Sequence, residues 1–223
     1  MWYSNKPSST VTANVGDYMI TKEYIIEITT QLYLQKGVKA VTVADISKEL
    51  STSKRTIYNH FIDKTDLMQA CIEQYLAAIR SNNDEIINSC SSAIEAMGKI
   101  QQQILKRADY SNTNFYKDIL KYYPSVLKNS YQKNAEFAFR ELLYLSKWGI
   151  KEGLFRKDMD PEVTMVTVQT LLKLCNNSKK FPPKNFSKAR LTEGVMVAYL
   201  RGFCTEKGLI ELEKQKQLYL NID

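Results

Sequence analysis

The feature of this sequence that most constrains its fold is the scarcity of residues that interrupt helices. No proline occurs between Pro7 and Pro124, and the 223 residues include 8 glycines and 5 prolines, about half the usual share. Proline lacks a backbone N–H and glycine is favoured where φ is positive, so a chain that seldom uses either is most easily built from helices. Apolar residues recur at helical spacing from Thr21 onward, without strand-like alternation. We therefore predict an all-α fold.

Composition narrows the class of protein. Hydrophobic residues make up 44% and charged residues 25%, which is ordinary for a globular chain and excludes a wholly disordered one. No stretch approaches the ~20 consecutive apolar residues of a membrane span. The four cysteines have no C-x-x-C spacing and the chain has one histidine, which argues against a zinc site or a disulfide framework. We expect reduced thiols in a cytoplasmic protein that uses no membrane, metal or other cofactor.

Two short helices joined by a tight turn are predicted early in the chain. Thr42 can cap the first of them, and Asp45 stands three residues on, as in a variant capping box. Ser53 can cap the second, which would carry Ile57 and Phe61 inward. Helices of about eight residues separated by a turn of three or four residues are typical of a helix-turn-helix.

Residues 37–67 resemble the DNA-binding segment of the TetR family of bacterial transcriptional regulators. The positions that match in combination are Gly37, Thr42, Ile46, Leu50, Ser53, Thr56, Tyr58, His60, Phe61, Lys64 and Leu67. Residues 153–161 also look like the family's usual run into its penultimate long helix. One position departs from the pattern: Ser51 stands where glycine is usual, and serine adopts a positive φ at a cost of order 1 kcal/mol.

The resemblance implies three regions. Residues 1–19 would form a flexible N-terminal arm, and residues 20–66 a three-helix DNA-binding domain that contains the helix-turn-helix. Residues 67–223 would form a larger helical domain for regulation, effector binding and dimerisation. The implied function is a dimeric, sequence-specific transcriptional regulator, most simply a repressor released from a palindromic operator in double-stranded DNA by a small apolar or amphipathic effector.

Two other classes of function are alternatives to this one. A protein–protein adaptor or co-regulator on the same fold stays open, because residues 1–68 hold 8 Lys and Arg against 7 Asp and Glu. An enzyme is not expected, because the sole histidine lies in the motif and the chain has no Gly-rich phosphate loop. The formal net charge of +7 decides little, since residues 163–192 alone carry six basic residues and no acid. That run predicts a solvated loop, with an acidic partner as the alternative.

Side chains suited to DNA gather on the second motif helix. Arg55 could pair with O6 and N7 of guanine, and Thr56 offers a methyl group to thymine. Lys64, at the start of the next helix, could contact a phosphate. By resemblance, Thr42 contacts a phosphate and Ala44 occupies a base-reading position. The predicted DNA-binding residues are Thr42, Ala44, Ser53, Lys54, Arg55, Thr56, Tyr58, Asn59, His60 and Lys64.

Four of these predicted contacts have a structural alternative. Lys54 and Arg55 could form a solvated face, Tyr58 could cover the core, and His60 could be a packing residue. Ile57 and Phe61 are assigned to packing from the outset.

The predicted dimer interface consists of Gly194, Ala198 and Gly202. These small residues recur every four positions, so they form one stripe that lets another helix approach closely; an intrachain helix is the alternative partner. An effector pocket would lie between the middle helices, where aromatic residues are frequent, although no single pocket residue is predicted. Those aromatic residues are Phe115, Tyr116, Tyr122, Tyr123, Tyr131, Phe137, Phe139 and Trp148.

Overall fold

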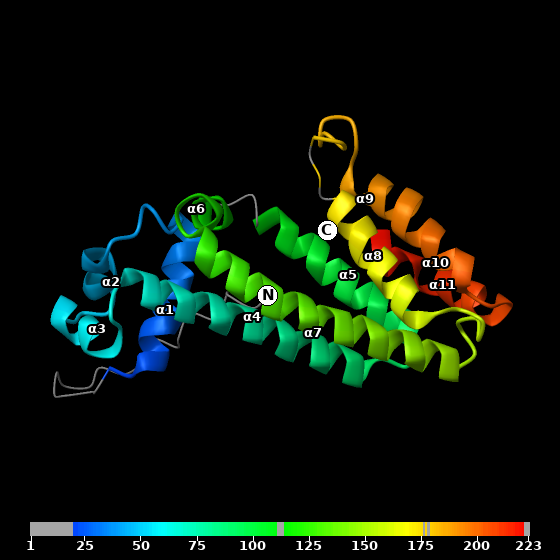
Figure 1. The fold of residues 1–223 in the computed structure, drawn as a ribbon, viewed down its shortest axis with the longest axis horizontal. Helices are drawn as coiled ribbons and strands as arrows, with labels where there is room; N and C mark the ends of the chain where they lie inside the picture. Colours follow the sequence, from blue (N-terminus) through cyan, green and yellow to red (C-terminus); the bar gives the residue numbers. More distant parts are fainter. Residues whose placement is uncertain (1–19, 111–113, 176, 178, 221–223) are drawn as a thin grey trace. The chain divides into compact units, whose positions relative to one another are not determined.

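The computed structural model describes residues 20–110, 114–175, 177 and 179–220, so the arm predicted over residues 1–19 lies outside the described residues. Every regular element in the described ranges is helical, apart from one isolated antiparallel bridge between Phe155 and Cys204 (Figure 1). The all-α prediction is confirmed. In chain order the elements are α1 (Lys22–Lys36), α2 (Val43–Glu49), α3 (Lys54–His60), α4 (Lys64–Ser89), α5 (Ala93–Tyr110), α6 (Asn114–Tyr122), α7 (Pro124–Lys151), α8 (Pro161–Cys175), α9 (Lys188–Leu191), the π-helix η1 (Thr192–Val197), α10 (Ala198–Phe203) and α11 (Glu206–Leu220).

The chain divides into two compact units, and neither is a single stretch of sequence. The first unit comprises residues 1–77 and 111–130, and the second comprises residues 78–110 and 131–223. Helices α4 and α7 each contribute to both units. The first unit therefore contains α6 as well as the helix-turn-helix. These compact units do not test the predicted division by function into an arm (1–19), a DNA-binding domain (20–66) and a regulatory domain (67–223), which stays a prediction.

The first unit packs α1, α2, α3 and the start of α4 around one apolar core that α6 completes. Burying a large apolar side chain contributes roughly 1.5–3 kcal/mol, so these contacts fix how the short helices α2 and α3 are oriented. The core side chains include Ile25 and Tyr33 of α1, Ile46 of α2, Ile57 of α3, Met68 of α4, Phe115 and Ile119 of α6, and Val126 of α7.

Two sharp stops in this unit use a positive φ. Gly37 ends α1 with φ 86°, and Ser51 follows α2 with φ 50°. Backbone hydrogen bonds from Ser51 N to Lys48 O (3.1 Å) and from Thr52 N to Ser47 O (2.9 Å) hold the turn. Ser51 thus occupies the left-handed region that its glycine-like position predicts.

The second unit is a helical bundle with its own core. Leu145, Phe155, Met165, Val197 and Leu212 are at most 1% exposed. The core extends to the end of α11, where the buried Tyr219 hydroxyl donates to Ile94 O at 2.7 Å. None of the helices over the described residues is both long and apolar enough to cross a membrane.

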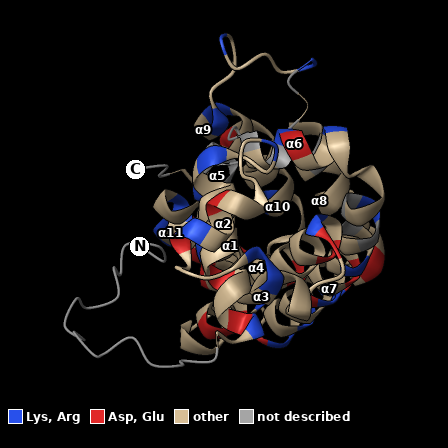
Figure 2. Cartoon of the chain, turned by 90° about the vertical axis from the view of Figure 1, so that its left-hand side faces the viewer, with Lys and Arg blue, Asp and Glu red and all other residues tan. Residues whose placement is uncertain are grey.

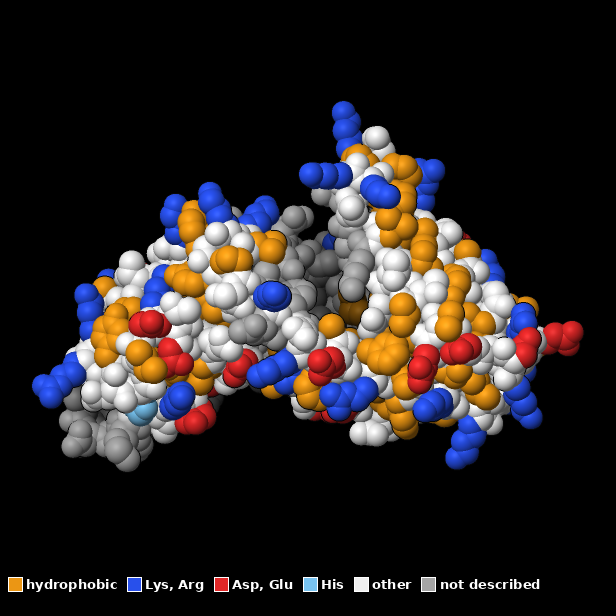
Figure 3. Space-filling view, viewed as in Figure 1, with side chains coloured by type: hydrophobic (Ala, Val, Ile, Leu, Met, Phe, Trp, Pro, Cys, Tyr) orange, Lys and Arg blue, Asp and Glu red, His pale blue; other side chains and the backbone are white. Residues whose placement is uncertain are grey.

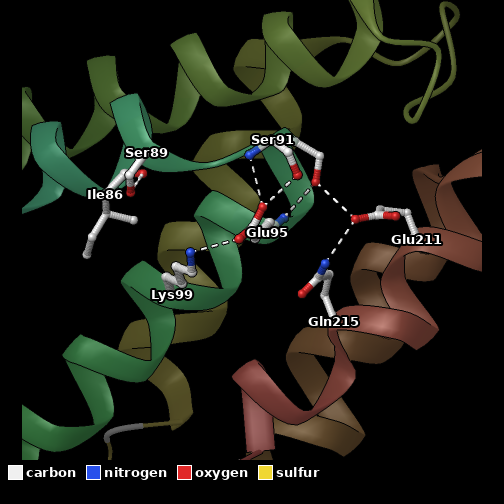
Figure 4. A network of polar contacts seen from close by, with 8 residues as sticks. Ile86, Ser89, Ser91, Glu95, Lys99, Glu211 and Gln215 are labelled. Atoms are coloured by element: carbon white, nitrogen blue, oxygen red, sulfur yellow. Dashed lines mark hydrogen bonds and ion pairs between the residues drawn. The ribbon is translucent and has the colours of Figure 1, made fainter.

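A polar network joins the start of α5 to α11 (Figure 4). Ser92 Oγ accepts from Glu95 N at 3.1 Å and donates to Glu211 Oε1 at 3.2 Å. Glu95 Oε2 in turn accepts from the Ser91 amide (2.9 Å) and the Ser91 hydroxyl (2.8 Å). Ser92 therefore caps α5, and the Glu95 carboxylate reaches the residue before the cap.

One short break interrupts the helical run from Lys188 to Leu220. α10 ends and α11 begins on either side of Cys204 and Thr205, because Cys204 is extended (ψ 148°) and Thr205 Oγ1 accepts from Gly208 N at 3.1 Å. Gly208 lies inside α11 and does not end a helix. A Cβ at that position would lie 1.9 Å from Leu154 O, so the glycine permits a close backbone approach.

The segment before α9 projects basic side chains (top of Figure 3). Lys179, Lys180 and Lys184 are exposed. Phe181 and Phe186 pack edge-to-face, with their ring centres 5.3 Å apart.

Candidate DNA-binding site

The two motif helices begin with the predicted caps. Thr42 Oγ1 accepts from Asp45 N at 3.2 Å, while Asp45 Oδ2 accepts from Thr42 N (2.8 Å) and Thr42 Oγ1 (2.6 Å), which completes a capping box. These hydrogen bonds hold the pKa of the Asp45 carboxyl below its usual range. Ser53 Oγ accepts from Thr56 N at 3.0 Å and caps α3. Both cap predictions are confirmed.

Helix α3 separates its side chains between core and solvent. Ile57 is 1% and Phe61 2% exposed, as the packing prediction requires. Lys54 and Arg55, in the first turn, are exposed. Burial of the opposite face therefore fixes which face of α3 a nucleic acid could meet.

The remaining predicted contact residues occupy the two motif helices and their caps. Ala44, Ser53 and Asn59 are exposed, and Tyr58 is 49% exposed. His60 is half-buried, with its ring 6.5 Å from the Phe61 ring. Contact of any of these side chains with DNA stays a prediction.

Charges of both signs lie on the helices of this unit (Figure 2). Lys48, Lys54 and Arg55 are exposed, and so are Asp45 and Glu49. Attraction to DNA phosphates grows with the number of basic side chains that contact them. Because this surface carries both signs of charge, recognition of a DNA sequence depends on where individual side chains lie.

Lys64 has partners inside its own unit. Its ammonium donates to Val38 O at 2.7 Å and to Val41 O at 2.6 Å, both in the loop between α1 and α2. Burial lowers the pKa of Lys64, and the charges of Asp118 and Asp45 oppose that shift. The phosphate contact stays a prediction, with at most one N–H of the ammonium left for it.

One contact to the loop between α1 and α2 is not predicted by the sequence. The amide N of Lys39 donates to Asp118 Oδ2 of α6 at 2.7 Å, across 79 positions of sequence. The Lys39 ammonium also lies 5.3 Å from the centre of the Tyr122 ring. No local pattern links these residues; only the packing of α6 reveals them.

Comparison with known proteins decides what this motif belongs to. Residues 25–71, which span α1 to the start of α4, match the profile of the family described as "Bacterial regulatory proteins, tetR family". Residues 25–71 thus form a TetR-family DNA-binding segment. The comparisons support a DNA-binding transcriptional regulator rather than an enzyme.

Individual TetR-family proteins resemble larger parts of the chain. The HTH-type transcriptional repressor KstR2 of Rhodococcus jostii is 25% identical over 143 residues, 62% of this chain and 70% of that protein. The uncharacterised HTH-type regulator YvaF of Bacillus subtilis is 30% identical over 81 residues, 36% of this chain and 41% of that protein. The crystal structure of a TetR-family regulator from Cytophaga hutchinsonii covers 83% of this chain and 96% of its own, with a TM-score of 0.65 and 17% identity. At that identity the structural likeness concerns the fold alone.

The stripe of small residues predicted as the dimer interface lies on η1 and α10. Gly194, Ala198 and Gly202 are all exposed. Among the described residues, no atom beyond the helix's own backbone and the neighbouring residues lies within 4 Å of a Cβ built on Gly194 or Gly202. The stripe thus has room for a further helix.

The second unit encloses a cavity of about 50 Å³. Nearly all of its lining is apolar, and its polar side chains are Gln101 and Tyr219. None of the predicted aromatic residues whose side chains the structure describes lines this cavity; the side chains of Tyr116 and Tyr131 lie outside the description. The lining residues are Met97, Ile100, Gln101, Ile104, Leu142, Leu145, Met165, Val168, Leu172, Met196, Leu200 and Tyr219.

Proposed function

We propose that this protein is a homodimeric TetR-family repressor that binds a palindromic operator and leaves it when a small effector binds. The observation that carries the proposal is the orientation of α3, whose first turn exposes Lys54 and Arg55 while Ile57 and Phe61 anchor the opposite face. In a helix-turn-helix the second helix enters the major groove with its N-terminal residues against base edges. Repression is the preferred direction because the relative KstR2 is named a repressor.

The contact residues take distinct roles in this proposal. Arg55 reads a guanine, and Thr56 and Ala44 offer apolar contact to thymine methyl groups. Lys54 and Thr42 contact phosphates, which position the helix without reading sequence. The other proposed contacts are Ser53, Tyr58, Asn59 and His60; the Lys64 ammonium is left out because it donates to Val38 O and Val41 O within its own unit.

The homodimer would use the stripe of Gly194, Ala198 and Gly202. Hydrophobic side chains also lie on the surface over α8 (Figure 3), where Val163 is 64% and Val166 53% exposed. Exposed apolar side chains beside a stripe of small residues suit a helix-packed interface. A two-fold dimer would present two copies of α3 to half-sites about 34–36 Å apart, or further for a long operator, so the operator would be palindromic.

The effector would bind in the second unit at the cavity. Its apolar lining favours an uncharged, apolar or amphipathic molecule, with Gln101 available for one polar group. A volume of about 50 Å³ holds a few waters, whereas small-molecule pockets are ~300–1,000 Å³. Binding would therefore enlarge the cavity, and an effector acts by favouring one conformation of the protein over another.

Selection from a random pool of duplexes tests the DNA-binding part directly. The full chain is expected to enrich a palindrome, and sedimentation of the complex should show two chains per duplex. Enrichment of no sequence would instead support the adaptor alternative, and enrichment of a single half-site bound by one chain would remove the homodimer from the proposal.

A further inference from the structure

The loop between α1 and α2 is fastened from two sides by side chains that lie elsewhere in the first unit. Lys64 of α4 binds its carbonyl groups, and Asp118 of α6 binds its amide at Lys39. We propose that Lys64 and Asp118 are positioning residues for DNA binding, which set the orientation of α2 and α3 through this loop. The inference rests on the proposed function, because it concerns how the reading helix is held.

Lys64 fixes the curvature of the loop between α1 and α2. The Lys64 ammonium donates to two carbonyl oxygens, Val38 O at 2.7 Å and Val41 O at 2.6 Å, so both ends of this short segment are tied to one point. The side chains of Val38 and Val41 are 0% and 1% exposed, which anchors the same segment in the core. Hydrogen bonds from a charged donor are roughly twice as strong as neutral ones.

Asp118 holds the same loop from α6. Phe115 and Ile119 bury one face of that helix in the core of the unit. Asp118 and Tyr122, four positions apart, are both directed at Lys39: the carboxylate accepts the Lys39 amide at 2.7 Å, and the ring lies under its ammonium at 5.3 Å. α6 therefore holds the middle of the loop through its contacts with Lys39.

The loop leads directly into the DNA-reading elements. Thr42 follows Val41 and forms the capping box of α2. Ile46 of α2 and Ile57 of α3 are buried in one core, so a displaced α2 would carry α3 with it. Base contacts tolerate little misplacement, because a hydrogen bond weakens steeply outside its preferred distance and angle.

The charge of Asp118 makes the proposal sharply testable. A carboxylate in the unit that binds DNA repels phosphates, so its removal would strengthen DNA binding if only charge mattered. Positioning predicts the reverse for Asp118→Ala, which loses the acceptor. Asp118→Asn is the matched control, since it removes the same charge but keeps an oxygen that can accept the Lys39 amide.

The experiment measures affinity of the full chain for the duplex that the wild-type protein selects, across a range of salt concentrations. We expect Asp118→Ala to bind about tenfold more weakly than Asp118→Asn. Lys64→Met should bind more weakly by a similar factor with an unchanged salt slope, whereas loss of a phosphate contact would lower the slope by ~0.9. Equal affinity of the two Asp118 variants, or a reduced slope for Lys64→Met, overturns the proposal.

A second measurement covers variants that fail to fold. In the wild-type chain the Lys39 amide should exchange with solvent hydrogen markedly more slowly than the exposed Ala40 amide next to it, and equal rates would also overturn the proposal. If the wild-type chain selects no duplex at all, the proposed function fails instead, which separates the two outcomes.

Discussion

The Glu95 carboxylate links the start of α5 to the next turn of the same helix: Glu95 Oε1 lies 2.7 Å from the Lys99 ammonium, while Oε2 accepts from the Ser91 amide at 2.9 Å. These contacts lower the pKa of Glu95 to about 2, the bond with Lys99 contributing most. A carboxyl whose pKa is depressed on folding stabilises the protein above its unfolded pKa.

The first prediction concerns acid stability. The stabilisation from Glu95 should be fully present above its ordinary pKa of 4.5 and should disappear as pH falls toward about 2. Thermal unfolding of wild type and Glu95→Gln should therefore differ clearly at pH 7 and converge as the pH falls toward about 2. A gap that stays constant over this range, relative to an exposed control such as Glu162→Gln, would contradict the assignment.

The second prediction concerns the turn of the helix-turn-helix. Ser51→Gly should raise the free energy of unfolding by up to about 1 kcal/mol, because glycine adopts a positive φ without steric cost. Ser51→Ala gives no such relief and serves as the control. Chemical denaturation measures both; a glycine variant less stable than wild type would show that the turn is not strained.

The third prediction concerns the close approach at Gly208. Gly208→Ala should destabilise the protein by several kcal/mol, because the added Cβ would meet Leu154 O, a backbone atom that has little freedom to move. Gly202→Ala places the same methyl group in open space and is the matched control for intrachain packing. Similar denaturation midpoints for the two variants would refute the close contact.

The fourth prediction concerns sequence reading. Arg55→Ala should lose about 1–3 kcal/mol of discrimination at one base pair per half-site. Repeating the duplex selection with this variant should relax that base pair and leave the others unchanged. A uniform loss across all sequences would instead assign Arg55 to a phosphate.

The fifth prediction concerns the dimer. Gly202→Arg should yield monomers in sedimentation experiments at concentrations where the wild type is dimeric, because a long side chain on the stripe blocks helix approach. The far-ultraviolet circular dichroism should stay unchanged, since the position is open within the chain. A dimeric variant would move the interface elsewhere.

Local features of this protein could be read from its sequence because their partners lie a few positions apart. The caps at Thr42 and Ser53 and the left-handed turn at Ser51 each involve residues within five positions. The inward positions Ile57 and Phe61 followed from helical spacing for the same reason.

Features that depend on distant packing could not be predicted. The Lys39–Asp118 bond joins residues 79 positions apart, and Lys64 finds its carbonyl partners 23 and 26 positions away. The break at Cys204 and Thr205 carries no proline or glycine, and the nearby Gly208 suggests a helix end although its role is to admit Leu154 O. In each case the decisive partner comes from another element.

The discontinuity of the first unit has a consequence for how the protein is made. During synthesis the segment up to residue 77 emerges before Phe115, Ile119 and Val126, which complete its core. The helix-turn-helix therefore reaches its full stability only after about residue 130 has left the ribosome. A nascent chain that stalls before that point would carry α3 without the core residues of α6 and α7 that fix its orientation. The order of these elements along the chain therefore disfavours DNA binding by an incomplete protein.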